Sequence, residues 1–352
     1  MKAQVIDVHT HLYPRRYVDF LRARTEVPRI AGEVGSERFV IFEEEAKSNG
    51  GRPIDTTYWE VSEKLAFMDR HGIDQSVISI GNPWLDPIPA DQGAELARRL
   101  NDDLASLEGD TGGRMCGLGV LPPGRVADAV AVAKEIAGTP TLHGVITGPR
   151  PCGLMLDDKD LDPLWKVLDE SGVAVFLHPH YGAAMNDLAG YGHALPIGIA
   201  FPVETTIAVA RMVFAGVLGR FPDLKIMAAH GAGTVPYLAG RLDAAWRSDP
   251  STHARLPHPP SSDLAKLWAD AVLYHPRAMR AAADLVGASK LMFGTDHPFS
   301  VSDPVANLEA VRSEFGGADL ASVLAVAARE FFALPEIQPQ SVVGGKQSGE
   351  KS

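Results

Sequence analysis

The chain has 352 residues, of which 45% are hydrophobic and 22% charged, and its mean hydropathy is -0.02. This composition is that of a globular protein with ample apolar material for a large core, and it excludes a disordered, collagen-like or small disulfide-stapled chain. Thirty-three Lys and Arg residues against 44 Asp and Glu give a net charge of -11, the wrong sign for binding nucleic acid or an anionic membrane surface.

The beginning of the chain predicts a cytoplasmic protein. The first apolar run begins at Gln4 and reaches His9, which leaves no room for a signal peptide, and no window approaches 18 uncharged apolar residues. Cys116 and Cys152 form neither a C-x-x-C motif nor a disulfide framework. We therefore expect two reduced, packed thiols and no membrane partner.

From residue 4 to about residue 334, short apolar runs alternate with stretches of helical spacing, which is the pattern of βα units. Helices are expected, for example, over 59–71, 126–136 and 205–218. The expected strands are 4–8, 76–80, 115–121, 142–147, 173–177, 225–229, 271–274 and 290–293. Eight parallel strands with intervening helices favour a (β/α)8 TIM barrel over an open doubly wound sheet.

Residues 12–58 do not follow this alternation and predict a small lid insertion after the first strand. Within it, residues 37–42 resemble a short strand, and residues 48–51, Ser-Asn-Gly-Gly, are a turn signal. We expect a single barrel domain over residues 1–335 that includes this lid. Residues 336–352 contain almost no apolar side chains and predict a disordered tail.

Polar residues interrupt the apolar strands at their carboxyl ends, the face on which TIM barrels carry their active sites. His9 and His11 lie two apart, so an extended strand directs both imidazoles to one side. His178 follows the fifth strand and Asp296 the eighth. Three imidazoles and a carboxylate suit one divalent metal ion per chain, zinc most readily or else manganese. Core histidines bonded to the backbone are the competing interpretation.

Other polar residues at this face are candidates for binding or chemistry. His230, after the sixth strand, could act as an acid, a base or a charged donor, or could be structural. Arg52 in the lid and Asn82 after the second strand could hold an anionic planar ligand, although composition alone makes both surface loop residues. His193, in the loop after the fifth strand, is by itself typical of an exposed histidine.

Four motifs together resemble a known family. They are DVHTH at residues 7–11, HPH at 178–180, HGAG at 230–233 followed by GR at 240–241, and GTDHPF at 294–299. They resemble the aminocarboxymuconate-semialdehyde decarboxylase-like branch of the amidohydrolase superfamily, over about residues 5–332. Within that branch, residues 181–182, 191–196 and 201–212 look most like isoorotate (5-carboxyuracil) decarboxylases.

The resemblance implies roles for particular residues. It implies metal ligation by His9, His11, His178 and Asp296, and an active-site role for His230. It implies substrate contacts by Arg52, Asn82, His193 and Phe299. It also implies that Arg241 reaches the site of a neighbouring subunit, so we expect a homodimer or a larger homo-oligomer.

The chemistry expected from this resemblance is a decarboxylation. Loss of CO2 from an sp2 carbon without an electron-sink cofactor leaves a poorly stabilised carbanion, so protonation of that carbon should come before C–C cleavage. We expect a metal-dependent, non-oxidative decarboxylase of an aromatic or pyrimidine carboxylic acid, with Asp296 delivering the proton while Arg52, His193 and His230 neutralise charge. The alternative is a metal-dependent hydrolase of a lactone or amide, or a hydratase. A barrel that serves only as a binding module would hold no stoichiometric metal.

Overall fold

The computed structural model describes residues 4–47, 50–188 and 190–337. Eight strands form one parallel sheet in the order β1-β5-β6-β7-β8-β9-β10-β11. Their bounds are β1 Ile6–His11, β5 Gln75–Ser79, β6 Met115–Val120, β7 Leu142–Thr147, β8 Val175–Leu177, β9 Ile226–Ala228, β10 Trp268–Asp270 and β11 Leu291–Met292. A parallel bridge between Thr10 and His297 brings the chain after β11 beside β1. The sheet is therefore a nearly closed barrel, which confirms the expected fold.

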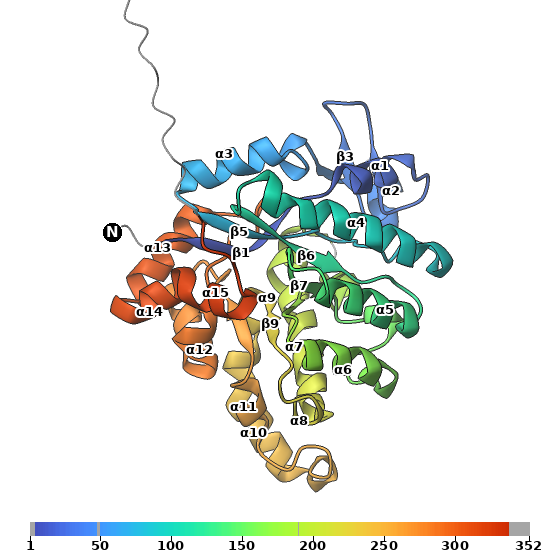
Figure 1. The fold of residues 1–352 in the computed structure, drawn as a ribbon. Helices are drawn as coiled ribbons and strands as arrows, with labels where there is room; N and C mark the ends of the chain where they lie inside the picture. The colour runs from blue at the N-terminus through green and yellow to red at the C-terminus, as the bar shows by residue number, and fades with distance from the viewer. Residues whose placement is uncertain (1–3, 48–49, 189, 338–352) are drawn as a thin grey trace, which may run out of the picture.

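Helices surround the barrel, since each parallel connection returns the chain along its outside (Figure 1). The longer ones are α3 Val61–His71, α4 Ala90–Asp110, α5 Val126–Ala137, α6 Asp162–Ser171, α7 Phe201–Phe214, α10 Val235–Ser248, α12 Pro276–Val286, α13 Pro304–Glu314 and α15 Ala327–Phe332. The short ones are α8 Val217–Arg220, α9 Ala229–Ala232, α11 Pro260–Leu264 and α14 Gly317–Ala321.

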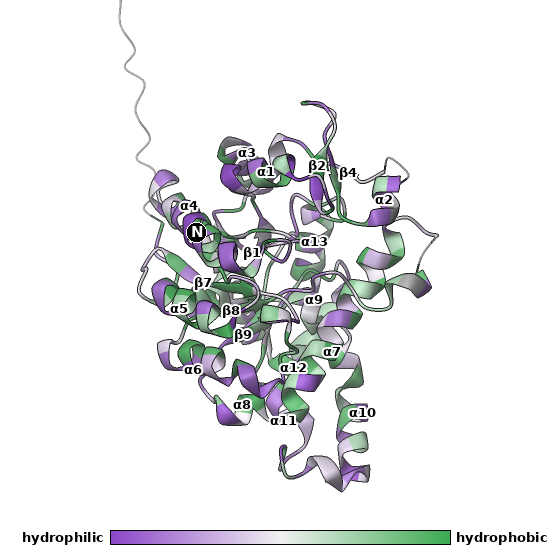
Figure 2. Cartoon of the chain, turned by 90° about the vertical axis from the view of Figure 1, so that its right-hand side faces the viewer, coloured by the Kyte–Doolittle hydropathy of each residue, from purple (hydrophilic) through white to green (hydrophobic). Residues whose placement is uncertain are grey.

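The helices pack on the barrel through apolar faces of helical spacing. On α5 the buried residues are Ala129, Val132, Ala133 and Ile136, which recur at three and four positions. Every residue of β5 and β6 is buried, and the mostly apolar sequence of β6 predicts this burial. In Figure 2 the ribbon near β7 and β8 is accordingly mostly hydrophobic, while many helices alternate between hydrophobic and hydrophilic colours.

The predicted lid insertion stands between β1 and α3. It contains α1 Arg15–Ala23, α2 Glu43–Lys47 and a small antiparallel sheet of β2 Arg29–Ala31, β3 Arg38–Val40 and β4 Arg52–Pro53. The strand expected over 37–42 is β3, whereas α1 was not foreseen. In Figures 1 and 2 these elements lie at the opposite end of the molecule from α10 and α11. Residues 48–49 of the predicted turn, and all but the first two residues of the predicted tail, lie outside the described residues.

The prediction for the seventh strand was wrong. The sequence pattern placed it at 271–274, but pairing with β9 and β11 covers Trp268–Asp270. The strand ends there because the Asp270 carboxylate accepts the backbone N–H of Val272 at 3.0 Å and the chain turns. His275 therefore does not end a strand. It caps α12, with its Nδ1 accepting the backbone N–H of Arg277 at 3.1 Å.

A π-helical turn at Pro196–Ala200 leads into α7, and together they are 19 residues long with a mean hydropathy of 1.5. Length and composition alone would allow this helix to cross a membrane. Two charged side chains within it are, however, engaged by the barrel and its helices. Glu204 accepts the backbone N–H of His180 at 2.7 Å, and Arg211 forms an ion pair with Asp157 at 2.7 Å. These contacts are typical of a covering helix of the barrel.

Candidate metal centre

The four side chains expected to bind metal meet at the carboxyl end of the barrel. His9 and His11 lie on β1, His178 follows β8, and Asp296 comes shortly after β11. None is more than 6% exposed. One candidate ligand atom from each lies within 4.8 Å of those of the other three. The tertiary structure therefore brings together side chains from distant parts of the sequence.

The spacing within this cluster matches the spacing of ligands around one metal ion. Oδ1 of Asp296 lies 3.4 Å from Nε2 of His9 and 3.4 Å from Nε2 of His11. Tetrahedral ligands bonded to zinc at about 2.1 Å are roughly 3.4 Å apart. These three buried atoms have no hydrogen-bond partner among the described residues. Because buried polar atoms are nearly always partnered, a divalent cation fits this donor set.

The far nitrogen of each imidazole is held by a neighbour, which turns Nε2 toward the cluster. Nδ1 of His9 lies 2.6 Å from Oδ2 of Asp270, and Nδ1 of His178 lies 2.6 Å from the carbonyl oxygen of Pro179. Nδ1 of His11 lies 3.0 Å from the hydroxyl of Ser79. Since a carboxylate and a carbonyl only accept, Nδ1 of His9 and of His178 carries the proton. Partners of this kind fix the tautomer and the ring orientation that a metal requires.

The electrostatics favour neutral imidazoles at two of the three histidines. Burial lowers the pKa of His11 to about 4 and holds the pKa of His178 well below its usual value. Burial would also lower the pKa of His9, but the carboxylates of Asp270 and Asp296 outweigh it and raise that pKa to about 10. Burial favours protonation of Asp296, yet the surrounding imidazoles, His9 first, hold its pKa well below the usual range.

These shifts predict that metal uptake releases one proton. Without metal, His9 stays protonated below about pH 10, whereas a metal ligand must offer a free lone pair. The metal association constant should therefore rise about tenfold per pH unit between about pH 5 and 9. In the metal-free protein, the stabilisation from protonated His9 is fully present below pH 6.5 and is lost as the pH rises through about 10. Titrations with zinc in buffers of different ionisation enthalpy measure the proton count; a pH-independent affinity would contradict the assignment of His9.

A second group of candidate ligand atoms lies among Glu108, Cys116 and His143. Nε2 of His143 is 2.6 Å from Oε2 of Glu108, and its Nδ1 is 3.1 Å from the carbonyl oxygen of Phe332. A separation of 2.6 Å is a hydrogen bond and is too short for two ligands of one ion. Burial raises the pKa of the Cys116 thiol to about 12, so it stays protonated. This group is a histidine hydrogen-bonded to a carboxylate, beside a packed thiol.

His230 lies next to the four-residue cluster on a left-handed backbone. It follows β9 and has φ of 55°, and Asp296 has φ of 59°. Such conformations cost a residue with a side chain roughly 1–3 kcal/mol and gather at functional sites. The Asp270 carboxylate holds this backbone by accepting the N–H of His230 at 3.0 Å. Nε2 of His230 then lies 3.9 Å from Oδ2 of Asp296.

A small cavity opens directly on the cluster. It is lined by Arg52, Asn82, His178, Ile197, Phe201, His230, Asp296, Phe299 and Val301. The ring of Phe299 lies 5.1 Å from the ring of His11 and 5.4 Å from the guanidinium of Arg52. The cavity therefore combines a cation from the lid and apolar walls with the metal cluster. Three of the expected substrate contacts, Arg52, Asn82 and Phe299, are among its lining residues.

The other two expected contacts do not line this cavity. His193 is 41% exposed, and its Nε2 lies 3.2 Å from Oε1 of Glu45, so it joins the loop after β8 to α2 of the lid. Arg241 is exposed on α10. Neither reaches the cluster of its own chain in this structure.

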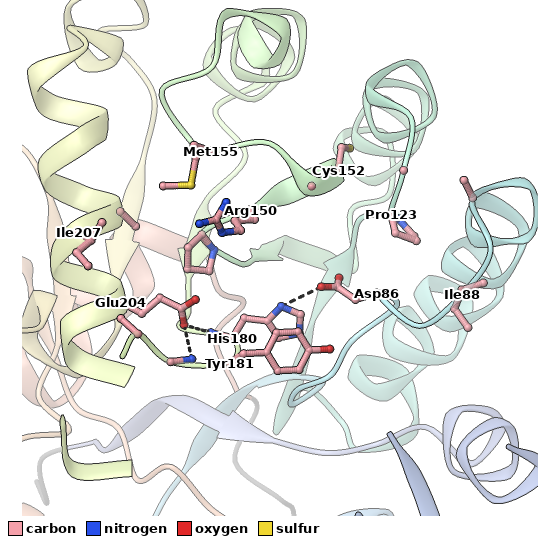
Figure 3. Close-up of a pocket in the computed structure, with 17 residues that line it drawn as sticks. Asp86, Ile88, Pro123, Arg150, Cys152, Met155, His180, Tyr181, Glu204 and Ile207 are labelled. Carbon is pink, nitrogen blue, oxygen red and sulfur yellow. Dashed lines mark hydrogen bonds and ion pairs between the residues drawn. The ribbon is translucent and has the colours of Figure 1, made fainter. Parts of the chain in front are cut away.

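A larger cavity of about 550 Å³ lies beside the cluster (Figure 3). His180 lines it, with Nδ1 3.0 Å from Oδ2 of Asp86. The ring of Trp84 stacks on His180 at 4.4 Å and lies 6.0 Å from the ring of His178, so these rings separate the cavity from the metal ligands. His180 therefore packs behind the metal ligands and is not one of them.

Two carboxylates at the site, Asp270 and Glu204, were not predicted from the sequence. Asp270 supports both His9 and His230, but the misplaced seventh strand left it outside any strand end. Glu204, near the start of α7, was not among the predicted site residues, and its Oε2 accepts the N–H of His180 at 2.7 Å and of Gly182 at 2.9 Å (Figure 3). The sequence did contain a signal for Asp270, because this aspartate ends the short apolar run Trp268-Ala269.

Comparison with known proteins identifies the family of this chain. Residues 6–334 match the model of the amidohydrolase family, and the chain belongs to that family. It is 28% identical over 338 residues to the 2-amino-3-carboxymuconate-6-semialdehyde decarboxylase of Dictyostelium discoideum, across 94% of this chain and 91% of that one.

Solved structures similar to this chain include further decarboxylases. The isoorotate decarboxylase (IDCase) of Metarhizium anisopliae has a TM-score of 0.89 and 33% identity, across 96% of this chain and 99% of that one. A dihydroxybenzoic acid decarboxylase of Polaromonas sp. JS666 with bound manganese shares the fold, with a TM-score of 0.73 and 18% identity across 94% of this chain and 97% of that one. The expected family is confirmed, and the decarboxylases found favour the expected activity over the hydrolase alternative.

Proposed function

We propose that this chain is a metal-dependent, non-oxidative decarboxylase of an aromatic or pyrimidine carboxylic acid similar to isoorotate. The observation that carries the proposal is the cluster of three imidazoles and one carboxylate that opens on a cavity with a guanidinium and apolar walls. The relatives named above are all decarboxylases, which supports this reaction over hydrolysis of a lactone or amide and over hydration.

We assign one divalent ion per chain to His9, His11, His178 and Asp296. Zinc suits three imidazoles and a carboxylate, and manganese is the second candidate because the Polaromonas protein binds it. When bound, the ion supplies a positive charge that attracts the substrate carboxylate and an adjacent ring oxygen.

We assign substrate binding to Arg52, Asn82 and Phe299. The guanidinium of Arg52 lies over the Phe299 ring, so a planar acid against that ring meets a cation suited to two parallel hydrogen bonds. The amide nitrogen of Asn82 donates to the backbone carbonyl of His180, which supports an orientation with the amide oxygen toward the cavity. An amide oxygen accepts from a ring N–H, as a pyrimidine would offer.

The proton for the ring carbon is assigned to Asp296. Because the imidazoles hold the pKa of Asp296 well below its usual range, this carboxyl is ionised before substrate binds. His230, with Nε2 3.9 Å from Oδ2 of Asp296, is the group suited to pass it a proton. The substrate anion then favours the protonated carboxyl through like-charge repulsion. Transfer of the proton to the ring carbon precedes C–C cleavage, and the electron pair of the broken bond restores the ring as CO2 leaves.

We also propose a cytoplasmic homodimer or larger homo-oligomer of this chain. Tyr237 is 87% exposed on α10, the helix that carries Arg241, and an exposed aromatic side chain there suits a subunit contact. Arg241 would then serve the neighbouring subunit's site. His193 would contact substrate after its ion pair with Glu45 opens. Light scattering of the purified protein tests the oligomeric state.

The reaction can be tested with a panel of acids. Metal-replete protein is incubated with isoorotate, γ-resorcylate, 5-carboxyvanillate and 2-amino-3-carboxymuconate-6-semialdehyde, and released CO2 is measured. We expect turnover of at least one, with isoorotate first, and in heavy water one deuterium on the carbon that carried the carboxylate. Release of an acid from a lactone or amide, without CO2 from any of the four, would favour the hydrolase.

Substitution Arg52→Ala should weaken substrate binding and leave metal content unchanged. A charge-assisted hydrogen bond contributes about 1.5–3 kcal/mol, so KM should rise roughly 10- to 100-fold. Arg52→Lys keeps the charge without the paired donors, so its KM should lie between those of the parent protein and Arg52→Ala. Steady-state kinetics with metal analysis checks this; loss of metal from Arg52→Ala would show that the lid arginine supports the cluster instead.

Substitution Asp296→Asn keeps an oxygen atom for the metal but removes the carboxyl that carries the proton. The variant should bind metal and substrate, less tightly, and turn over at least about 100-fold more slowly, the usual loss for a general acid. Single-turnover measurements at saturating metal separate this from weaker binding. Near-normal turnover would transfer the proton-donor role to His230.

A further inference from the structure

The barrel closes at a seam that runs through the metal cluster. Between β1 and the chain after β11, the backbone N–H of Asp296 donates to the carbonyl of His9 at 2.7 Å, and the N–H of His11 donates to the carbonyl of His297 at 2.7 Å. His9 and His11 stand on one side of this seam and Asp296 on the other. The separation of the ligands therefore depends on how the two sides are held together.

Lys64 joins the two sides. It lies on α3 and is 0% exposed. Its Nζ lies 2.7 Å from the hydroxyl oxygen of Thr10, on β1. On the other side it lies 2.6 Å from Nδ1 and 3.3 Å from the carbonyl oxygen of His297. In the sequence, Thr10 stands between the ligands His9 and His11, and His297 directly follows the ligand Asp296.

The atoms at hydrogen-bond distance from Nζ are a hydroxyl oxygen, an imidazole nitrogen and a carbonyl oxygen, and the carboxylates of Asp7 and Asp296 attract the amine from further away. Nζ of Lys64 and Nδ1 of His297 are at hydrogen-bond distance, so this contact crosses the seam. An apolar residue at position 64 would fill the space without the cost of desolvating an amine. What the amine adds is hydrogen bonds to atoms on both sides of the seam.

The same segment is fixed by two further contacts. The ring of His297 stacks on Phe67, one turn along α3 from Lys64, with centroids 3.7 Å apart. Two residues before His297, Thr295 donates both its backbone N–H, at 3.0 Å, and its hydroxyl, at 2.6 Å, to the buried carboxylate of Asp7 on β1. Asp296 lies between these two attachments with φ of 59°. A left-handed turn needs such support to hold one geometry.

We propose that Lys64 is a positioning residue of the metal centre, tying β1 to the segment 295–297 so that Asp296 stays at ligand distance from His9 and His11. This inference rests on the proposed metal site, but not on the identity of the substrate. Residues that orient metal ligands typically contribute 10- to 100-fold to metal affinity.

The test compares Lys64→Met, which keeps the length of the side chain and removes its donors, with the matched control Lys290→Met. The amine of Lys290 also donates to a backbone carbonyl, with Nζ 2.8 Å from the oxygen of the partly buried Ala265, but Lys290 lies just before β11, away from the seam. Each metal-free protein is titrated with Co²⁺, whose visible spectrum reports the ligand geometry. Asp270→Asn serves as a positive control for a lost ligand support.

We expect Lys64→Met to weaken Co²⁺ binding about 10- to 100-fold and to change the visible spectrum, while Lys290→Met binds like the parent protein. A folded Lys64→Met protein with unchanged affinity and spectrum would overturn the proposal. If Lys64→Met does not fold, Lys64→Gln decides, since it keeps a polar end on a shorter side chain and leaves the direct hydrogen bond from the Thr10 hydroxyl to the carbonyl of His297 in place. Weaker Co²⁺ binding there supports the proposal, and unchanged binding overturns it.

The Co²⁺ titrations distinguish a failure of the proposal for Lys64 from a failure of the proposed function. If the parent protein binds no Co²⁺ at His178, as judged by an unchanged titration of His178→Ala, the metal site itself is wrong. If the parent binds Co²⁺ but decarboxylates none of the acids in the panel, the activity fails while the role of Lys64 is still decided by the titration.

Discussion

Three imidazoles and a carboxylate face one another in the interior of the barrel, and this concentration of polar atoms is the constraint on which the surrounding structure depends. At 3.4 Å, the nitrogen and oxygen atoms are spaced as ligands of one ion. Such an arrangement persists only when each side chain is prevented from turning toward another partner. The contacts of Asp270, Ser79 and the carbonyl of Pro179 with the far nitrogens have this effect.

Asp270 links the metal cluster to the residue assigned to proton transfer. One carboxylate accepts from the ring of His9 and from the backbone N–H groups of His230 and Gly231. The charge that raises the pKa of His9 in the metal-free protein thus also holds the left-handed turn at His230. A change at Asp270 would affect both, so the metal site and the acid-base site form one electrostatic unit.

The barrel assembles this unit from segments that are far apart in sequence. The ligands come from β1, β8 and the chain after β11, and the lid between β1 and α3 adds Arg52. Parallel strands bring their carboxyl ends to one face, which gathers the side chains, while the contacts at the seam set their separation. Arg52 is the lysine or arginine among the described residues that line the small cavity, and its guanidinium suits an anionic substrate.

Several features of this protein were determined by the sequence alone. Alternation of apolar runs with helical spacing predicted the barrel, because parallel strands buried on both faces need continuous apolar residues. The two-residue spacing of His9 and His11 predicted a shared direction, because a strand alternates its side chains. Polar residues after apolar runs located His178, His230 and Asp296 at the carboxyl face. These inferences depend on local periodicity, which one stretch of chain expresses by itself.

The tertiary structure decided the rest. The run 271–274 is as apolar as a strand, but pairing with β9 and β11 ends the strand at Asp270 and turns that carboxylate inward. Lys64 has the sequence context of a surface lysine on a helix, yet the barrel seam encloses it. His193 pairs with Glu45 because the lid and the loop after β8 meet in space. Each of these outcomes depends on which residues distant in sequence become neighbours, and local periodicity carries no information about that.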